Sequence, residues 1–233
     1  MSQIYEVGKP SVGKPSKRIE LTWDDFVQLV LEITIQAYKS MHQEKQAQRD
    51  WEEDTFTSNL EAHLQPIALE NAVLVEPFKT VITDDMREGK QSHKKANEID
   101  LSLFMPWKDY DKIHFAWEAK KIGDKRIDKK YQILNSEYVN EAIYRFIRLK
   151  YAAGLSNAGI LGYVLAGEPE IIVEDINQTM GRIREKAALP PSNHLRITDP
   201  IGDFRDIYKS QPTRTDSTQI ELHHLLLCFD FLD

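Results

Sequence analysis

The sequence predicts an α/β protein in which α-helices flank a mixed β-sheet. In the first third of the chain, apolar residues recur at helical spacing. From Ala72 onward the pattern changes to short apolar runs separated by polar loops, which is typical of a β-meander. A helical stretch and another strand-like run follow, as expected for a crossover. The predicted core order is therefore helix, three strands, helix, strand, or αβββαβ.

The chain is expected to form one domain preceded by a flexible arm. Residues 1–21 contain the repeat Val-Gly-Lys-Pro-Ser at 7–11 and 12–16, and its glycines and prolines disfavour helix and strand interiors. A chain of 233 residues fits a single core of ordinary to large size. We therefore expect residues 22–233 to form one domain.

The composition favours a cytoplasmic protein without a membrane span. No apolar run has the roughly 18 residues that a transmembrane helix needs, and the polar first residues do not look like a secretory signal. The single cysteine, Cys228, agrees with a reducing compartment and is expected to be a buried, inert thiol. The net charge of -7 argues against a generally basic nucleic-acid binder but leaves room for local basic clusters. Two such clusters are Arg87, Lys90, Lys94 and Lys95, then Lys120, Lys121, Lys125, Arg126, Lys129 and Lys130.

The boundaries of the elements follow from caps and periodicity. Thr22 and Asp25 resemble a capping box, which predicts that a helix begins there, and a second helix is expected from about Glu52 to Ile67. Pro169 suits the first turn of a later helix, which Pro190 and Pro191 should end. Strands are expected at 72–83, 99–105, 113–122, 159–166 and 219–229, with the crossover helix at 136–152; the pattern at 195–218 defines no element.

Two of the expected strands carry charged residues on one face. Alternation in 97–104 buries Ile99, Leu101 and Leu103 and places Asp100 on the opposite side. The same period in 113–120 puts Glu118 and Lys120 on one face and Trp117 on the other. If these strands are neighbours, two carboxylates and an ammonium group converge. Such an arrangement is costly unless a cation and a substrate use it.

Phosphodiester hydrolysis uses this combination of groups. Carboxylate oxygens bind Mg²⁺, which neutralises charge developing on the phosphate and lowers the pKa of a bound water. A lysine nearby can orient or deprotonate that water and offset phosphate charge. The motif therefore favours a metal-dependent phosphodiesterase.

These residues resemble the PD-(D/E)XK nuclease superfamily, which includes restriction endonucleases and repair nucleases. The likeness rests on Ile99-Asp100, seventeen intervening residues, Glu118-Ala119-Lys120 and the surrounding element order, within about 52–167. Ile99 replaces the usual proline. The resemblance implies a restriction-endonuclease-like fold, with Asp100, Glu118 and the Ala119 carbonyl as ligands of Mg²⁺ or Mn²⁺, and Lys120 as the water-positioning residue.

The resemblance also implies a partner and a setting. Nucleic acid is the implied substrate, with DNA and endonucleolytic cleavage favoured over RNA and exonucleolytic cleavage. Restriction or antiphage defence is the setting in which such small nuclease domains are expected, and a homodimer is left open. Many members of the superfamily add a glutamate from the helix before the meander. Glu53 is the first candidate and Glu61 the second. The alternative, which the sequence favours for each glutamate taken alone, is an ordinary exposed helix residue.

Other candidates have a structural explanation. Glu141 and Arg145 lie four residues apart on the crossover helix, which fits a surface ion pair as well as a functional role. His223 and His224 are adjacent on a strand, point to opposite faces and are expected to be hydrogen-bonded in the interior. The sequence has no zinc-finger spacing and no GxxxxGK phosphate loop.

Two alternatives to the nuclease remain at the level of sequence. The first is a catalytically inactive protein of the same fold, which serves as a structural or nucleic-acid-binding module. The second is an unrelated α/β scaffold in which Glu118 and Lys120 merely pair with surface charges. The complete set of Asp100, Glu118 and Lys120 favours the enzyme, because an inactive site has no physical reason to keep clustered charges.

Overall fold

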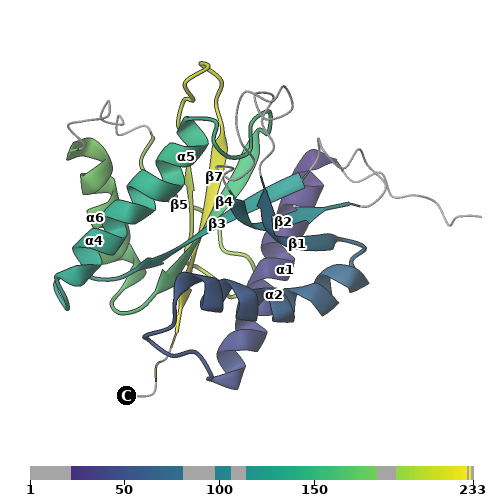
Figure 1. Cartoon of the computed structure of the whole chain (residues 1–233), viewed down its shortest axis with the longest axis horizontal. Helices are drawn as coiled ribbons and strands as arrows, with labels where there is room; N and C mark the ends of the chain where they lie inside the picture. The colour runs from purple at the N-terminus through teal and green to yellow at the C-terminus, as the bar shows by residue number, and fades with distance from the viewer. Residues whose placement is uncertain (1–21, 81–97, 106–113, 183–192, 230, 232–233) are drawn as a thin grey trace, which may run out of the picture.

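A seven-stranded mixed sheet lies between two layers of helices (Figure 1). The computed structural model describes residues 22–80, 98–105, 114–182, 193–229 and 231. The strand order is β1-β2-β3-β4-β7-β6-β5. The expected flexible arm, the first basic cluster and the prolines at 190 and 191 lie outside the described residues. The α/β class and the mixed sheet flanked by helices are confirmed.

The two helices before the sheet follow the predicted boundaries closely. Helix α1 spans Trp23–Glu44, and its N-cap is Thr22. The hydroxyl of Thr22 accepts a hydrogen bond from the Asp25 amide at 3.1 Å, while the Asp25 carboxylate accepts one from the Thr22 amide at 3.0 Å. Helix α2 spans Glu53–Glu70. The predicted capping box is therefore present and starts α1 at the expected residue.

The meander and the parallel strands form the centre of the sheet. Strands β1 (Leu74–Thr80), β2 (Glu98–Phe104) and β3 (His114–Ile122) pair antiparallel in sequence order. Strand β4 (Asn157–Val164) then pairs parallel with β3, and β7 (Glu221–Cys228) pairs parallel with β4. The parallel steps need crossovers, which helices supply on one face of the sheet.

The crossover helix differs from the prediction in extent and in type. It consists of α4 (Lys130–Glu137), a π-helix η2 (Tyr138–Ile143) and a single turn α5 (Tyr144–Ile147). The expected end at residue 152 is wrong because Leu149 and Ala152 adopt positive φ values of 58° and 51°, which a right-handed helix cannot contain. Helix α6 (Pro169–Arg182) begins at the expected proline.

The segment without a clear sequence pattern adds two short strands. Strand β5 has only the two residues Arg196–Ile197, and β6 spans Ile207–Ser210. They pair antiparallel with each other, and β6 pairs antiparallel with β7. Such short strands show too few periods for sequence alternation to identify them.

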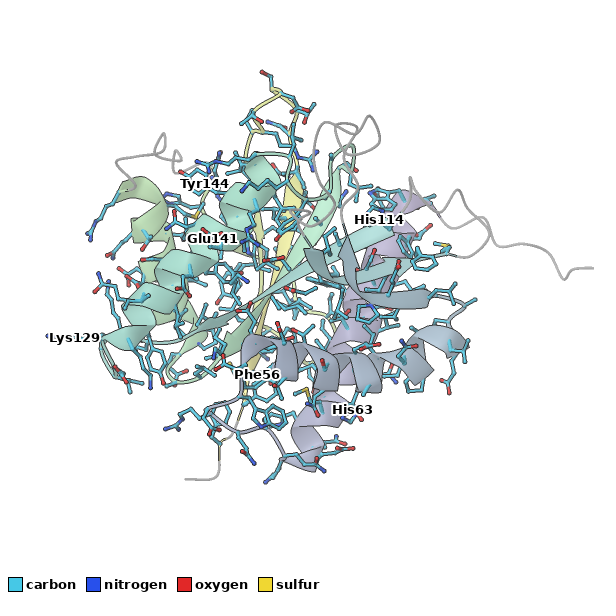
Figure 2. The ribbon with its side chains drawn as sticks, in the orientation of Figure 1. Phe56, His63, His114, Lys129, Glu141 and Tyr144 are labelled. Carbon is cyan, nitrogen blue, oxygen red and sulfur yellow. The ribbon has the colours of Figure 1, made fainter. Side chains whose placement is uncertain are left out.

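Each face of the sheet has its own apolar core. Leu101, Leu103 and Trp117 pack in the cluster under α1 and α2, as their alternation predicts. Ile99 differs, since it packs in the other cluster, under the crossover helix and α6, at the point where β2 stops pairing with β3. Figure 2 shows the two layers: Phe56 lies with α2 on one side, and Glu141 and Tyr144 lie with the crossover helix on the other. Within the described part of the chain, no helix is long and apolar enough to cross a membrane.

Candidate active site

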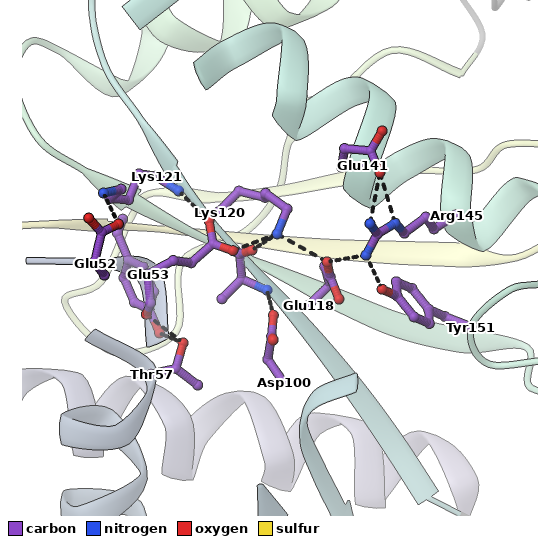
Figure 3. A network of polar contacts seen from close by, with 12 residues as sticks. Glu52, Glu53, Thr57, Asp100, Glu118, Lys120, Lys121, Glu141, Arg145 and Tyr151 are labelled. Carbon is purple, nitrogen blue, oxygen red and sulfur yellow. Dashed lines mark hydrogen bonds and ion pairs between the residues drawn. The ribbon is translucent and has the colours of Figure 1, made fainter. Parts of the chain in front are cut away.

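The candidate site lies where β2 and β3 separate. Their pairing ends at Leu101 and Trp117, so Asp100 and Glu118 both adjoin the last pair. The Ala119 amide then donates a hydrogen bond to the Asp100 carboxylate at 2.6 Å instead of to a strand carbonyl. The side chain of Asp100 thus replaces backbone pairing at the strand opening. The predicted convergence of Asp100, Glu118 and Lys120 is what the structure contains (Figure 3).

Glu118 is a buried carboxylate with one oxygen left unsatisfied. Its side chain is 2% exposed, and its Oε1 lies 3.1 Å from Lys120 Nζ. Its Oε2 is buried and has no hydrogen-bond partner among the described residues. Burial, with a smaller contribution from the charge of Asp100, raises the pKa of Glu118 to about 8. An unpaired buried oxygen of this kind is a natural place for a cation to bind.

The pKa of Asp100, like that of Glu118, is raised. Burial raises its pKa to about 6, although the hydrogen bond from the Ala119 amide and the charge of Lys120 both oppose that shift. The two carboxylates therefore favour a bound positive charge at neutral pH.

Lys120 connects the carboxylates to the first helical layer. Its Nζ donates to Glu53 at 2.6 Å and to the Ala119 carbonyl at 2.7 Å. Burial by itself would lower the pKa of Lys120, but the carboxylates of Glu118 and Glu53 outweigh that effect and raise it. Lys120 is therefore a charged ammonium group at neutral pH.

Glu53 is the helix glutamate that reaches the site. It is the first residue of α2, and its second oxygen accepts a hydrogen bond from the Lys121 amide at 3.2 Å. Glu61, the second candidate, instead accepts a hydrogen bond from Gln65 on its own helix. One turn beyond Glu53, Thr57 contacts the buried Tyr163 hydroxyl of β4 at 3.1 Å, which fixes α2 against the sheet.

Arg145 approaches Glu118 from the side opposite Lys120 (Figure 3). Its Nη1 lies 3.6 Å from Glu118 Oε1. The guanidinium also donates to Glu141 at 2.8 and 3.0 Å and to the hydroxyl of Tyr151. The predicted surface pair of Glu141 and Arg145 thus exists, but its arginine belongs to the site. Tyr151 could not be identified from the sequence, because it was expected within a regular helix.

The second basic cluster is not a free cationic surface. Apart from Lys120, four of its members pair with carboxylates: Lys121 with Glu52, Lys125 with Asp175, Arg126 with Asp124, and Lys130 with Asp128. The basic residues of this cluster are therefore largely neutralised by neighbouring carboxylates around the turn after β3. The cluster by itself therefore provides little attraction for a phosphate backbone.

The remaining sequence candidates have structural roles. His224 is fully buried and bonds to the hydroxyls of Tyr138 and Ser210, each at 2.8 Å. His223, on the opposite face, contacts Asn157 at 3.0 Å. Both histidines are thus hydrogen-bonded in the interior, as predicted. Cys228 is only partly buried, because it is the last residue of β7 at the edge of the core.

The donor atoms at the site fit a hard cation. Asp100, Glu118 and the Ala119 carbonyl offer oxygen only, which is the ligand type that Mg²⁺ and Mn²⁺ prefer. Within the described ranges, no group of three or more acidic, histidine or cysteine side chains has the arrangement of a metal site. An ion at this position would therefore depend on two carboxylates, a carbonyl and water, and Mg²⁺ commonly keeps several waters.

The charged residues that lie together in the structure are those of the sequence motif, and the two strands that carry them, β2 and β3, are neighbours as predicted. Comparison of the chain with protein-family models, with curated proteins and with solved structures gives no match in any of the three.

Proposed function

We propose that this chain is a metal-dependent nuclease that hydrolyses phosphodiester bonds, chiefly by endonucleolytic cleavage of DNA. The supporting observation is the convergence of Asp100 and Glu118 at the β2–β3 opening, with Lys120 in contact. Burying carboxylates is unfavourable unless cations compensate them. Lys120 and Arg145 both lie beside Glu118, but Lys120 is shared with Glu53 and Arg145 with Glu141, so the compensation is incomplete. A divalent cation site gives this arrangement a physical purpose.

Each residue has a distinct task in this proposal. Asp100, Glu118 and the Ala119 carbonyl would hold Mg²⁺ or Mn²⁺, which supplies charge neutralisation at the phosphate and a bound water of lowered pKa. Lys120 is charged at neutral pH, so it would orient the water and stabilise negative charge by donating hydrogen bonds rather than by removing a proton. Glu53 keeps the ammonium group in place through its 2.6 Å contact.

A second candidate is a catalytically inactive module of the same architecture. The observation in its favour is that Lys120 already pairs with Glu53 and Glu118, while Arg145 approaches Glu118 from the other side. In the structure these ion pairs partly compensate the buried charges without a metal ion, which the sequence alone did not show. The inactive module differs from the enzyme in one measurable respect, since it predicts no cleavage that depends on a divalent cation.

The test is cleavage of supercoiled circular DNA, linear DNA and RNA by the wild-type protein, with Mg²⁺, with Mn²⁺ or with a chelator. We expect metal-dependent conversion of the supercoiled circle to open forms, because only an endonuclease can cut a molecule without ends. Asp100→Asn should reduce the rate about 10²-fold or more, since it removes a ligand charge. The matched control is Asp203→Asn, an exposed carboxylate paired with Lys39, which should cleave at the wild-type rate.

No divalent-dependent cleavage of any of the three substrates, together with no detectable binding of Mg²⁺ or Mn²⁺, would favour the inactive module. Equal loss of activity in the Asp100→Asn and Asp203→Asn variants would also count against the assignment of the site.

A further inference from the structure

Among the described residues, Arg145 is a cation beside Glu118 that the proposed chemistry does not use. Its side chain is 31% exposed, at the margin of the buried Glu118 carboxylate. The 3.6 Å between its Nη1 and Glu118 Oε1 is longer than a hydrogen bond. Arginine and carboxylate usually form two parallel hydrogen bonds when the geometry allows it. Here the guanidinium is kept beside Glu118 without that pairing.

The hydrogen bonds of Arg145 leave part of its guanidinium available. Nε and Nη2 donate to the same oxygen of Glu141, and Nη1 donates to the hydroxyl of Tyr151. A guanidinium has five N–H groups, of which these bonds use three. Within the described residues, one N–H on each terminal nitrogen has no hydrogen-bond acceptor. Two such donors match the spacing of two oxygens of a phosphate group.

The fold constrains this guanidinium from several directions. Arg145 is the second residue of α5, which directly follows the π-helix η2, and the first residue of η2, Tyr138, bonds to the buried His224. A π-helical segment changes the rotational phase of the turn that follows it, and such segments are frequent at functional sites. The direction of Arg145 is therefore set by a departure from α-helical geometry that the core stabilises.

Tyr151, the second partner of the guanidinium, sits in a strained turn. Leu149 and Ala152 on either side of it have positive φ, a conformation that is unfavourable for non-glycine residues. The buried Arg214 donates to the Ala152 carbonyl at 2.8 Å, and the Tyr151 ring packs edge-on against Phe146. The turn thus brings the Tyr151 hydroxyl to Arg145 despite the strain.

We propose that Arg145 binds the non-bridging oxygens of the phosphate that is cut, and that Glu141 and Tyr151 are positioning residues for its guanidinium. This inference rests on the proposed nuclease function and adds a substrate contact to it. Glu118 lies between Lys120 and Arg145, so a phosphate beside Glu118 would meet a cation on either side. The planar donor fork of arginine suits that task better than a point charge.

The test is steady-state cleavage of DNA at saturating Mn²⁺, combined with calorimetric binding of Mn²⁺ and thermal unfolding of each variant. Arg145→Ala should lower kcat about 10²-fold, the size expected for loss of one group that stabilises transition-state charge. Its affinity for Mn²⁺ should stay within a few-fold of wild type, because Arg145 is not a metal ligand. Arg145→Lys keeps the charge but lacks the fork, so it should not restore the wild-type kcat.

Controls separate a phosphate contact from a structural ion pair. Arg148→Ala removes an exposed arginine that packs over Tyr144 and has no contact with Glu118, and it should cleave normally. Glu141→Ala should lower kcat with little change in KM, because the guanidinium loses its orientation, and Glu141→Gln should recover most of the rate by keeping an acceptor.

The outcomes are distinguishable from those of the proposed function. Wild-type cleavage that persists at full kcat in Arg145→Ala, or that Arg145→Lys restores completely, would overturn the role of Arg145 and leave the nuclease standing. A wild-type protein that binds Mn²⁺ but cleaves no DNA or RNA would overturn the nuclease, and this inference with it.

Discussion

Glu118 lies between two cations, Lys120 and Arg145, and beside a second carboxylate, Asp100. Burial disfavours its ionised form, and so does the neighbouring charge of Asp100, which is why its pKa rises to about 8. Burial and the nearby charge of Asp100 would favour binding of a divalent cation at Glu118. Without such a cation, the same two features destabilise the folded protein when Glu118 is ionised. Under the proposed function, the site would therefore exchange stability for metal binding.

This exchange predicts how Glu118→Gln affects stability. The pKa of Glu118 in the folded protein, about 8, exceeds its ordinary value of 4.5. The ionisation of Glu118 therefore does not reduce the free energy of unfolding below pH 4.5, but reduces it progressively as the pH rises toward 8. Glutamine cannot ionise and avoids that decline. In metal-free buffer the free energy of unfolding of the variant, relative to that of the wild type, should increase from pH 4.5 to pH 8. The increase should be about 1 kcal/mol or more at pH 7, as measured by urea unfolding.

The control for this comparison is Glu61→Gln, which changes a glutamate that accepts a hydrogen bond from Gln65 on its own helix. Its stability should follow that of the wild type across the same pH range. A difference between Glu118→Gln and wild type that does not grow with pH would contradict the proposed burial of an ionisable Glu118.

Individual residues of the site differ in how well the sequence predicts them. Alternation within two strands, together with the expectation that these strands pair, predicts that Asp100, Glu118 and Lys120 come together, although Ile99 departs from the predicted alternation. Glu53 was predicted only through the family resemblance, which implies a glutamate on the helix before the meander and leaves Glu61 as a second candidate. Tyr151 could not be predicted, because its position depends on a turn of strained backbone that is fixed by contacts distant in sequence, such as that of Arg214.

At the scale of elements, local signals predict the starts of helices better than their internal geometry. Thr22 and Pro169 mark the starts of α1 and α6, since a cap and a first-turn proline act through neighbouring residues. The π-helix Tyr138–Ile143 has no comparable local signal, because its tertiary contacts, such as that of Tyr138 with His224, stabilise it. The edge strand β5 is too short to show a period.

The capping box of α1 supplies a prediction at this scale. Thr22→Ala removes the hydroxyl that accepts the Asp25 amide and should lower the free energy of unfolding by about 1 kcal/mol. Denaturant unfolding measures this change. Thr22→Ser keeps the hydroxyl and should be close to wild type. Equal stability of the alanine and serine variants would show that the capping hydrogen bond contributes nothing to the free energy of unfolding.

At the scale of the whole molecule, the topology brings the charged residues together. The antiparallel meander places β2 beside β3, and the parallel crossover places the Arg145 helix over the same end of β3 as Glu118. Helix α2, on the other face, contributes Glu53. The mixed sheet and its flanking helices were predictable from periodicity, whereas the exact convergence of the three elements depends on tertiary packing.

The central claim is that Asp100 and Glu118 form a divalent metal site at which Lys120 assists hydrolysis. The most direct measurement is the rate of opening of supercoiled DNA over a Mg²⁺ titration, for wild type, Asp100→Asn and Lys120→Ala. High Mg²⁺ should partly restore Asp100→Asn, because that variant loses metal affinity. It should not restore Lys120→Ala, which should bind the metal normally yet cleave about 10²-fold more slowly. Full rescue of Lys120→Ala by Mg²⁺, or wild-type cleavage that is unaffected by a chelator, would contradict the claim.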